Sequence, residues 1–321
     1  MVIRSRAAVL AIALAAARAA ALPAQGGTSS GTLLDVPATP RALALQGAYT
    51  SVVRDDDEGS LFVNPAGMAA VHHLALGIST ERGLYGVRLS TGAIVLRVGR
   101  FFDVGVGVMY QDLGGDSVVA PDALNEFGTT NGERISAWNG LAVGALAYRR
   151  GMLSVGGSVK VLHEVIAGGA ANYRSSAVAG DLGFAVAVFD IFSFGAVLQN
   201  IGSGAHATNG AAAPLPRTGR IGVTLNFIDP EGTARLMATT DWVKPPGGNS
   251  YWAFGFEGGV VHNKVGVLGR LGISTGRADT DRSGLSLGAG LVVRTLRLDY
   301  AWQPYGALAG SQQRLGVRWI P

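Results

Sequence analysis

The chain has no cysteine and very little lysine: only three of its 26 basic residues are lysine. Without cysteine it has neither a disulfide framework nor a thiolate metal site. Charged residues are also scarce, at 15% of 321 residues, whereas the 48 glycines are about twice the usual share. The length allows one large domain or two ordinary ones. We interpret the excess of arginine over lysine as coding composition, and not as a nucleic-acid signal.

The first 24 residues have the pattern of a secretory signal peptide. Arg4 and Arg6 form a basic start, an apolar run extends from Ala7 to Ala17, and small residues precede the expected cleavage between Ala21 and Gln25. Removing this segment takes away three arginines and leaves 23 basic against 22 acidic groups. The exported chain is then nearly neutral, so we expect no nucleic-acid partner.

One apolar stretch, Leu182–Ile201, has the length of a membrane-spanning helix. It is rich in phenylalanine and valine, however, and Asp190 lies at its midpoint. On each side of Asp190 apolar residues occur at every second position, which is the period of a β-strand. The stretch therefore predicts two strands joined by a tight Phe189–Asp190 turn.

The same alternation continues almost to the end of the chain. In the sequence DVGVGVMYQ, Val104, Val106 and Val108 occupy one phase and glycines occupy the other. The apolar phase lacks charge, while the opposite phase carries glycine, serine and charged residues. A soluble β-sandwich also alternates, but its polar face normally holds far more lysine and glutamate. The pattern predicts an all-β transmembrane antiparallel β-barrel with an apolar outside and a polar lumen.

Fourteen strands are expected, an even number, and most have the 9 to 13 residues of a tilted membrane strand. They are Leu74–Glu81, Leu84–Arg100, Phe102–Asp112, Ala137–Arg149, Met152–Glu164, Ser175–Val188, Ile191–Ile201, Thr218–Ile228, Gly232–Lys244, Ser250–Val261, Lys264–Thr275, Ser283–Arg294, Thr295–Gln303 and Gln312–Ile320. Leu84–Arg100 is ambiguous because Arg88 and Arg97 fall on opposite phases, so it requires a bulge or forms two strands. The predicted divisions are a signal peptide at 1–24, a plug segment at 25–73 and a barrel at 74–321.

The connections between these strands alternate between long and short. The longest is Leu113–Ser136, and the short ones include "RRG" and "HN". Outer-membrane barrels have long extracellular loops and short periplasmic turns in this order. With a periplasmic N-terminus, four tryptophans fall at the extracellular ends of strands and Trp319 at the periplasmic end, as in an aromatic belt. The pattern indicates the outer membrane of a Gram-negative-type bacterium.

The stretch RALALQGAYTSVVRDDDEGSLFVNPAGMA, residues 41–69, resembles the N-terminal signature of the PorV/PorQ family, relatives of the FadL-like barrels. Further matching sites are Asp181-Leu182-Gly183, Asn200-Ile201-Gly202, Leu215-Pro216, Asp241 with Lys244-Pro245, Gly255-Phe256-Glu257, Arg270-Leu271-Gly272 and Asp299-Tyr300-Ala301. The chain departs from the family at Leu45-Gln46, at Phe62-Val63, and in ending on Trp-Ile-Pro instead of phenylalanine.

The resemblance implies that residues 40–70 form a small plug inside the barrel. Its motif residues are Arg41, Gly47, Asp55, Asp56, Asp57, Asn64, Pro65 and Gly67. We expect the three aspartates to pair with lumenal arginines, Pro65 to stop any helix, and Gly67 to permit a positive φ where the chain turns back. The alternative is that the acidic run is a solvated loop.

Charges of both signs fall on the expected lumenal phase. They are Lys160, Asp181, Arg220, Arg235, Asp241, Glu257, Arg270, Arg294, Arg297, Asp299 and Arg318. A lumen with this many charges argues against free passage of lipids through its centre.

Catalysis is not expected. The sequence GLSLG, residues 284–288, matches a nucleophile elbow, but that motif needs a strand-to-helix turn and Ser286 lies inside an alternating strand. The five histidines have no metal-ligand spacing, and no EF-hand-like spacing suggests calcium. We therefore predict no enzyme activity, no metal and no cofactor.

Three functions remain open, all with outer-membrane lipids as surroundings. The family resemblance implies a type IX secretion component that binds secreted proteins or secretion-machinery subunits. The second is a FadL-like passive transporter of hydrophobic small molecules, with the plug as its gate. The third is a structural, porin-like barrel.

Overall fold

The structure is a computed structural model. It describes residues 30–53, 56–122, 125–168, 172–188, 191–208, 212–228, 233–246, 248–275, 283–306 and 310–321. The predicted signal peptide, Asp55 and the Phe189–Asp190 turn lie outside these ranges.

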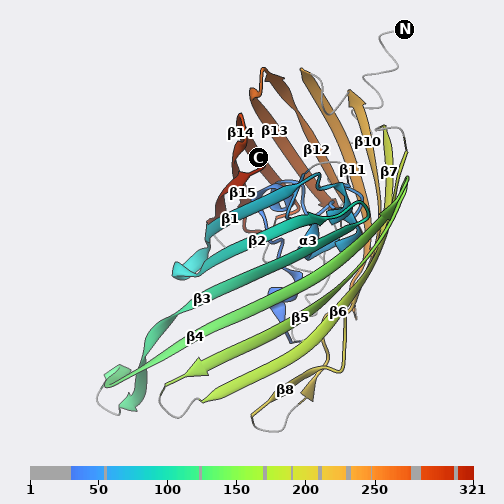
Figure 1. Ribbon diagram of the computed structural model, residues 1–321. Coiled ribbons are helices and arrows are strands. Elements are labelled where there is room, and N and C mark those ends of the chain that lie inside the picture. The colour runs from blue at the N-terminus through green and yellow to red at the C-terminus, as the bar shows by residue number, and fades with distance from the viewer. Residues whose placement is uncertain are drawn as a thin grey trace.

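Fourteen antiparallel strands form a closed barrel, which confirms the predicted fold class (Figure 1). Each strand pairs with its sequence neighbours, β7 pairs with β10, and β1 pairs with β16 to complete the closure. The strands are β1 Leu74–Arg82, β2 Arg88–Val98, β3 Phe102–Asp122, β4 Asn125–Arg150, β5 Leu153–Ala167, β6 Tyr173–Val188, β7 Phe192–Gly202, β10 Thr218–Ile228, β11 Ala234–Lys244, β12 Tyr251–His262, β13 Val265–Thr275, β14 Leu285–Val293, β15 Leu296–Pro304 and β16 Ser311–Trp319. Two short strands, β8 Ala205–Ala207 and β9 Ala212–Ala213, lie in the β7–β10 connection.

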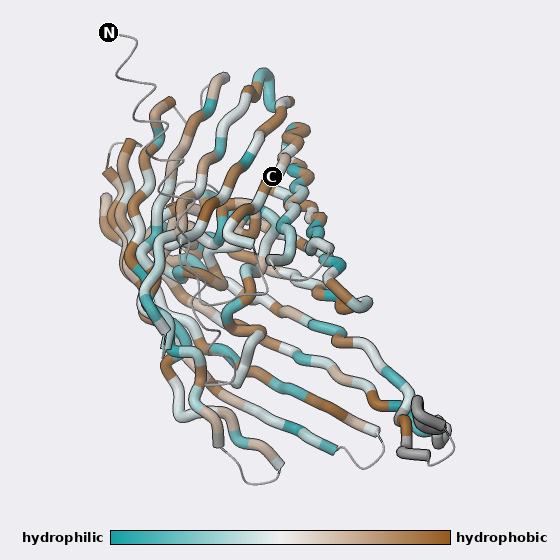
Figure 2. The backbone as a smooth tube through the Cα atoms, turned by 180° about the vertical axis from the view of Figure 1, so that it is seen from behind, coloured by the Kyte–Doolittle hydropathy of each residue, from teal (hydrophilic) through white to brown (hydrophobic). Residues whose placement is uncertain are grey.

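The barrel wall shows the predicted alternation of apolar and polar positions (Figure 2). Val106, Val159 and Val267 point outward and are 54%, 59% and 62% exposed. Their neighbours on the opposite phase are buried in the lumen or are glycines. This arrangement is the reverse of a soluble protein, and it suits a wall whose outer face contacts lipid. None of the helices among the described residues has the length and apolar character needed to cross a bilayer.

Two strand predictions need correction. The ambiguous segment Leu84–Arg100 contains one regular strand, β2, because a short 3₁₀ turn, η3 Leu84–Gly86, precedes it. Its ladders to β1 and β3 contain no bulge. Arg88 is exposed at the start of β2, whereas Arg97 points inward and its Nε lies 2.6 Å from Asp103 Oδ1.

The predicted long loop Leu113–Ser136 is wrong as well. β3 and β4 continue through most of it as a projecting hairpin, with register shifts after Asp112 and Ser117 (Figure 1). The rim of the barrel that bears this hairpin and the β7–β10 connection is called the long-loop rim below. The opposite rim, where β1 begins and where turns such as Gly151–Met152 lie, is called the short-turn rim.

A plug of four short helices fills the lumen: η1 Thr32–Asp35, α2 Pro40–Ala44, α3 Ser60–Val63 and η2 Pro65–Ala70. Figure 1 shows this N-terminal segment enclosed by the strands. The described chain starts at the long-loop rim, where the Ser30 amide donates to the Pro214 carbonyl at 3.0 Å. It then passes through the lumen and enters β1 at the short-turn rim.

Candidate functional site: the plug and the lumen

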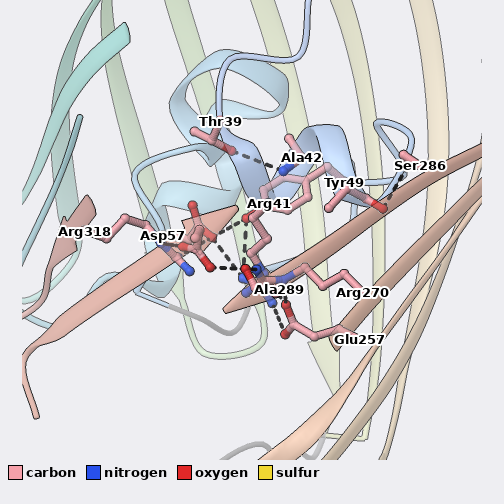
Figure 3. A network of polar contacts seen from close by, with 12 residues as sticks. Thr39, Arg41, Ala42, Tyr49, Asp57, Glu257, Arg270, Ser286, Ala289 and Arg318 are labelled. Carbon is pink, nitrogen blue, oxygen red and sulfur yellow. Dashed lines mark hydrogen bonds and ion pairs between the residues drawn. The ribbon is translucent and has the colours of Figure 1, made fainter. Parts of the chain in front are cut away.

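A ring of ion pairs joins the plug to the barrel wall (Figure 3). In this ring each arginine contacts two carboxylates, in the order Arg41, Asp57, Arg318, Asp299, Arg270 and Glu257. Arg41 and Asp57 belong to the plug, and the other four residues lie on β12, β13, β15 and β16. Three positive and three negative groups therefore neutralise one another inside the barrel. We call these six residues the ion-pair ring.

Arg41 is the plug's main contact in the ion-pair ring. Its Nη1 lies 2.9 Å from Asp57 Oδ2, and its Nε and Nη2 donate to the two Glu257 oxygens at 2.9 and 2.7 Å. This two-point contact with one carboxylate is the strong form of an arginine ion pair. Arg41 is held in place by α2, which begins with Thr39 accepting from the Ala42 amide at 3.2 Å and with Pro40 in its first turn.

The ion pairs made by the wall residues of the ion-pair ring are equally short. Arg270 Nε lies 2.5 Å from Glu257 Oε2, and its Nη1 lies 2.6 Å from Asp299 Oδ1. Arg318 Nε lies 2.8 Å from Asp299 Oδ2, and its Nη1 lies 2.8 Å from Asp57 Oδ2. A buried charge that loses its partner is strongly destabilising, so the ring couples the plug's position to the wall.

Two neighbouring plug carboxylates, Asp57 in the ion-pair ring and Glu58 next to it, have pKa values shifted in opposite directions. Burial favours the neutral form of Asp57, but Arg318 and Arg41 outweigh it and lower the pKa of Asp57, to which Tyr49 also donates a hydrogen bond. For Glu58, burial and then the charge of Asp57 raise the pKa to about 8. At neutral pH, Asp57 is therefore ionised while Glu58 keeps its proton, and the ring keeps equal numbers of opposite charges.

We expect Glu58 to make the unfolding free energy fall as pH rises from about 5 to 8. In that interval the folded chain binds a proton that the unfolded chain has released, because the pKa of Glu58 rises from 4.5 to about 8 on folding. Glu58→Gln should remove this contribution and flatten the profile relative to wild type. The measurement is the thermal unfolding midpoint in detergent between pH 5 and 8.5. The exposed Asp116→Asn should keep the wild-type slope, and equal slopes for wild type and Glu58→Gln would contradict the assignment.

Other polar contacts tie the plug to the same half of the barrel, β10 to β16. Asp241 on β11 is fully buried and accepts from the Tyr49 amide at 3.2 Å, from the Thr50 amide at 3.2 Å and from the Thr50 hydroxyl at 2.6 Å. Arg220 lies 2.9 Å from Asp241 Oδ2 and donates to the Gly47 carbonyl. Gly47 has φ +72° after α2, a conformation that favours glycine.

Ser286, the centre of the apparent nucleophile elbow, is one of these tethers. Its Oγ is fully buried and donates to the Ala44 carbonyl of the plug at 2.9 Å. The residue lies inside β14, where no helix follows. The motif therefore has a packing role here.

The Asn-Pro-Ala-Gly stretch caps and begins η2. Asn64 Oδ1 accepts from the Ala66 amide at 3.1 Å, while its Nδ2 donates to the Thr50 carbonyl at 2.8 Å. Pro65 occupies the first helical turn. The expected role of Gly67 needs correction: its φ is not positive. The space there is tight, since a Cβ would lie 3.0 Å from the Ser60 side chain.

The acidic run does not act as one unit. Asp57 contacts Arg41 and Arg318, but Asp56 does not reach a lumenal arginine. Asp56 instead accepts from the His72 amide at 2.6 Å. Asp55 lies outside the described residues.

The remaining predicted lumenal charges are separated along the barrel. Lys160 Nζ lies 2.8 Å from Asp181 Oδ2 and donates to Asn200 Oδ1 at 3.0 Å, at a bulge between β6 and β7. Arg235 and Arg297 line a cavity of about 20 Å³ beside Glu257. The prediction that Arg294 is lumenal is wrong. Arg294 lies exposed in the β14–β15 turn, with φ +58°.

Sequence reasoning missed two further ion pairs. Arg314 is almost completely buried, and its Nη2 lies 2.5 Å from Glu81 Oε2 while its Nη1 donates to the Pro37 carbonyl of the plug. Arg97 pairs with Asp103 across the β2–β3 turn. The alternation along β16 could have identified Arg314 as a lumenal residue, because it shares the phase of Arg318.

The other half of the lumen is largely apolar, apart from the Lys160–Asp181 and Arg97–Asp103 ion pairs. Buried side chains of β2 to β6 form one cluster with the plug, and its members are Leu33, Leu34, Ala38, Leu61, Phe62, Met68, Ala69, Val71, Ala75, Leu89, Ala93, Val95, Met109, Leu141, Val143, Ala147, Leu162, Ala177, Ala179, Ala205 and Leu215. We call this the apolar wall cluster. The ion-pair ring lies on β12 to β16, while the apolar wall cluster gives the opposite wall an apolar surface.

The plug's first helix contributes Leu33 and Leu34 to the apolar wall cluster. Leu33 is 1% exposed, and it is part of the same cluster as Leu162 of β5 and Leu215 of the β7–β10 connection. Its neighbour Gly31 fits directly against that surface, where a Cβ would lie 2.9 Å from Leu162 Cδ2. The N-terminal arm therefore fills, with its own leucines, an apolar surface at the long-loop rim.

No family model matches the chain, and no curated protein matches it in sequence. Several solved structures share its fold. They include a FadL homologue of Pseudomonas aeruginosa, with TM-score 0.60 and 13% identity over 89% of this chain and 99% of that one. The toluene transporter TbuX of Ralstonia pickettii has TM-score 0.58 and 15% identity over 88% and 97% of the two chains.

A third similar structure is the toluene transporter TodX of Pseudomonas putida, with TM-score 0.57 and 13% identity over 87% of this chain and 96% of that one. At such identities the likeness shows the fold alone. The protein therefore has the fold of a transmembrane β-barrel with an internal plug, and the FadL homologue and the toluene transporters share this fold. The finer resemblance to the PorV/PorQ family gains no support from these comparisons.

Proposed function

We propose that this barrel lets small hydrophobic molecules cross the outer membrane, and that the N-terminal arm gates their path. The observation that carries the proposal is the division of the lumen into two halves. The plug's ion pairs to the wall lie on β12 and β16, whereas Leu33 and Leu34 pack in the apolar wall cluster against the opposite wall.

Packing by apolar side chains suits a gate, and the arm's backbone hydrogen bond from Ser30 to Pro214 would break when the gate opens. The two leucines can leave the apolar wall cluster while the ion-pair ring still holds the rest of the plug in place. A hydrophobic molecule would replace them against Leu162 and its neighbours, and burial of its own apolar surface would offset the loss of the leucine contacts. The path would follow the apolar half and avoid the buried charges.

The similar structures support this direction, since two of them are toluene transporters. The secretion hypothesis predicts large partner-binding loops, and the longest expected one, Leu113–Ser136, is mostly a hairpin of β3 and β4. With the short turns in the periplasm, as in outer-membrane barrels, the long-loop rim and its apolar surface would face the cell exterior, where a hydrophobic substrate enters.

Flux through the purified barrel in liposomes tests the proposal, with toluene as the apolar probe. Leu162→Asn places an amide in the apolar wall cluster and should lower the flux about tenfold, the factor that about 1.4 kcal/mol gives. Thr239→Asn places the same side chain on the polar half, on β11, and should leave the flux unchanged. Equal effects of the two variants, or no toluene flux in wild type, would overturn the proposal.

A further inference from the structure

A second apolar feature lies outside the lumen, on the membrane-facing surface of β4 to β7, β10 and β11. It is a groove of about 720 Å³, a volume within the roughly 300–1,000 Å³ range of small-molecule sites. Its lining is almost entirely apolar and includes Leu146, Phe184 and Trp242. The proposed transport path does not use this groove.

The strand register explains how the groove forms. Outward residues of six strands line up as direct ladder partners, in the row Tyr148, Val155, Phe184, Ala196, Ile221 and Trp242. The next outward row places Gly157 and Gly219 beside leucines of β4, β6 and β7. Small residues thus form a recessed floor, and aromatic and branched side chains rise on either side of it.

The floor of the groove is a closed wall and not an opening into the lumen. All six strands remain paired along the groove, and the plug presses directly on the inner surface. A Cβ at the inward-facing Gly156 would lie 2.5 Å from the Ala66 amide nitrogen, and one at Gly183 would lie 2.0 Å from Asn64 Oδ1. Whatever occupies the groove therefore comes from the membrane side.

We infer that the groove holds the hydrocarbon chain of a membrane lipid. The outer face of a transmembrane barrel is surrounded by lipid chains, and the outward side chains of the groove carry no charge to exclude one. The outward Lys244 is the ladder partner of Gly219 and is exposed, so a lipid phosphate at this end of the groove would meet a cation. Trp242, two residues before it, is of the type enriched at the membrane interface.

Filling the groove without disturbing the wall provides the test. A Cβ added at Gly219 would meet no atom of the described residues within 4 Å, and one added at Gly157 would lie 3.6 Å from its nearest neighbour, so both positions accept a side chain. Gly157→Leu/Gly219→Leu should occupy the groove. The matched control is Gly144→Leu/Gly269→Leu, on the outward phase of β4 and β13, where the closest atom to an added Cβ is 3.8 Å away.

Wild type, the filled variant and the control are each reconstituted with palmitoyl-oleoyl phosphatidylethanolamine and washed in detergent. Native mass spectrometry then measures how much lipid stays bound to each. Wild type and the control should retain a bound lipid, and the filled variant should retain about tenfold less, equivalent to about 1.4 kcal/mol. Dihexanoyl phosphatidylethanolamine, with the same headgroup and short chains, should not be retained by any of them.

Three results would overturn the inference: equal retention by the filled variant and the control, retention of the short-chain lipid, or a wild-type dimer that the filled variant dissociates. The last would make a second copy of the chain the occupant. Gly219→Leu alone serves as the test if the double variant does not fold. Toluene flux through the lumen should be the same in all these variants, which keeps this inference separate from the proposed function.

Discussion

Replacing Arg41 with methionine is expected to destabilise the folded protein by about 3–5 kcal/mol, the usual cost of leaving a buried charge without its partner. Arg41 is 2% exposed and contacts both Asp57 and Glu257, so its loss leaves two carboxylates with one arginine neighbour each. The plug should also loosen, because these contacts join it to β12. We expect a lower thermal unfolding midpoint in detergent and a higher conductance in planar bilayers.

A second substitution separates charge balance from lost packing. Arg41→Met combined with Glu257→Gln removes one charge of each sign and leaves Asp57, Arg318, Asp299 and Arg270 balanced. The double variant should therefore be more stable than Arg41→Met alone, as expected for residues in one network. The exposed Arg150→Met should change stability by less than about 0.5 kcal/mol. An Arg41→Met barrel with wild-type stability and conductance would show that the ion-pair ring does not hold the plug.

The barrel itself was predictable because its signal is local. Period-2 alternation in segments such as Asp103–Gln111 reports which side of the wall faces lipid, and that information needs no distant contact. It also placed Glu257, Arg270, Asp299 and Arg318 on the lumenal phase. Arg294 was misplaced because a strand was extended into a turn, where the alternation no longer determines direction.

The hairpin of β3 and β4 was missed for a related reason. Residues 113–136 contain many glycines and polar side chains, and their sequence has no regular alternation of apolar and polar residues. Their strand structure depends on pairing between the two arms, as in Asp116 with Ile135. Composition alone therefore indicated a loop.

The functional arrangement of the lumen depends on pairings that sequence patterns do not encode. Arg41 and Glu257 are 216 positions apart, and nothing in either neighbourhood selects the other. The division into a polar and an apolar half arises only when the barrel closes and brings β2 to β6 opposite β12 to β16. The sequence also could not distinguish the aspartates of the acidic run, because their partners lie far away in the chain. Among the described members of the run, only Asp57 reaches the ion-pair ring.

Tethering the N-terminal arm to the long-loop rim is expected to stop transport. Ser30 and Leu215 suit two cysteines, because the Ser30 amide donates to the Pro214 carbonyl and the Leu215 side chain faces Gly31. The chain has no other cysteine. A bis-methanethiosulfonate reagent that joins the two thiols should lower toluene flux in liposomes about tenfold or more, since a tether that disfavours the open state by about 1.4 kcal/mol is enough. Reductant should restore the flux.

The physical reason is that the tether acts only on the movement of the arm. It leaves the ion-pair ring intact and changes one member of the apolar wall cluster, Leu215. Ser30→Cys treated alone with the same reagent should keep wild-type flux, and Leu215→Cys treated alone measures the effect of the lost leucine. A further loss of flux in the joined barrel would then reflect the arrested Leu33 and Leu34. If the doubly modified barrel, shown by mass to be joined, still passed toluene at the wild-type rate, the arm would not be the gate. The path would then lie along a part of the plug that the tether does not hold.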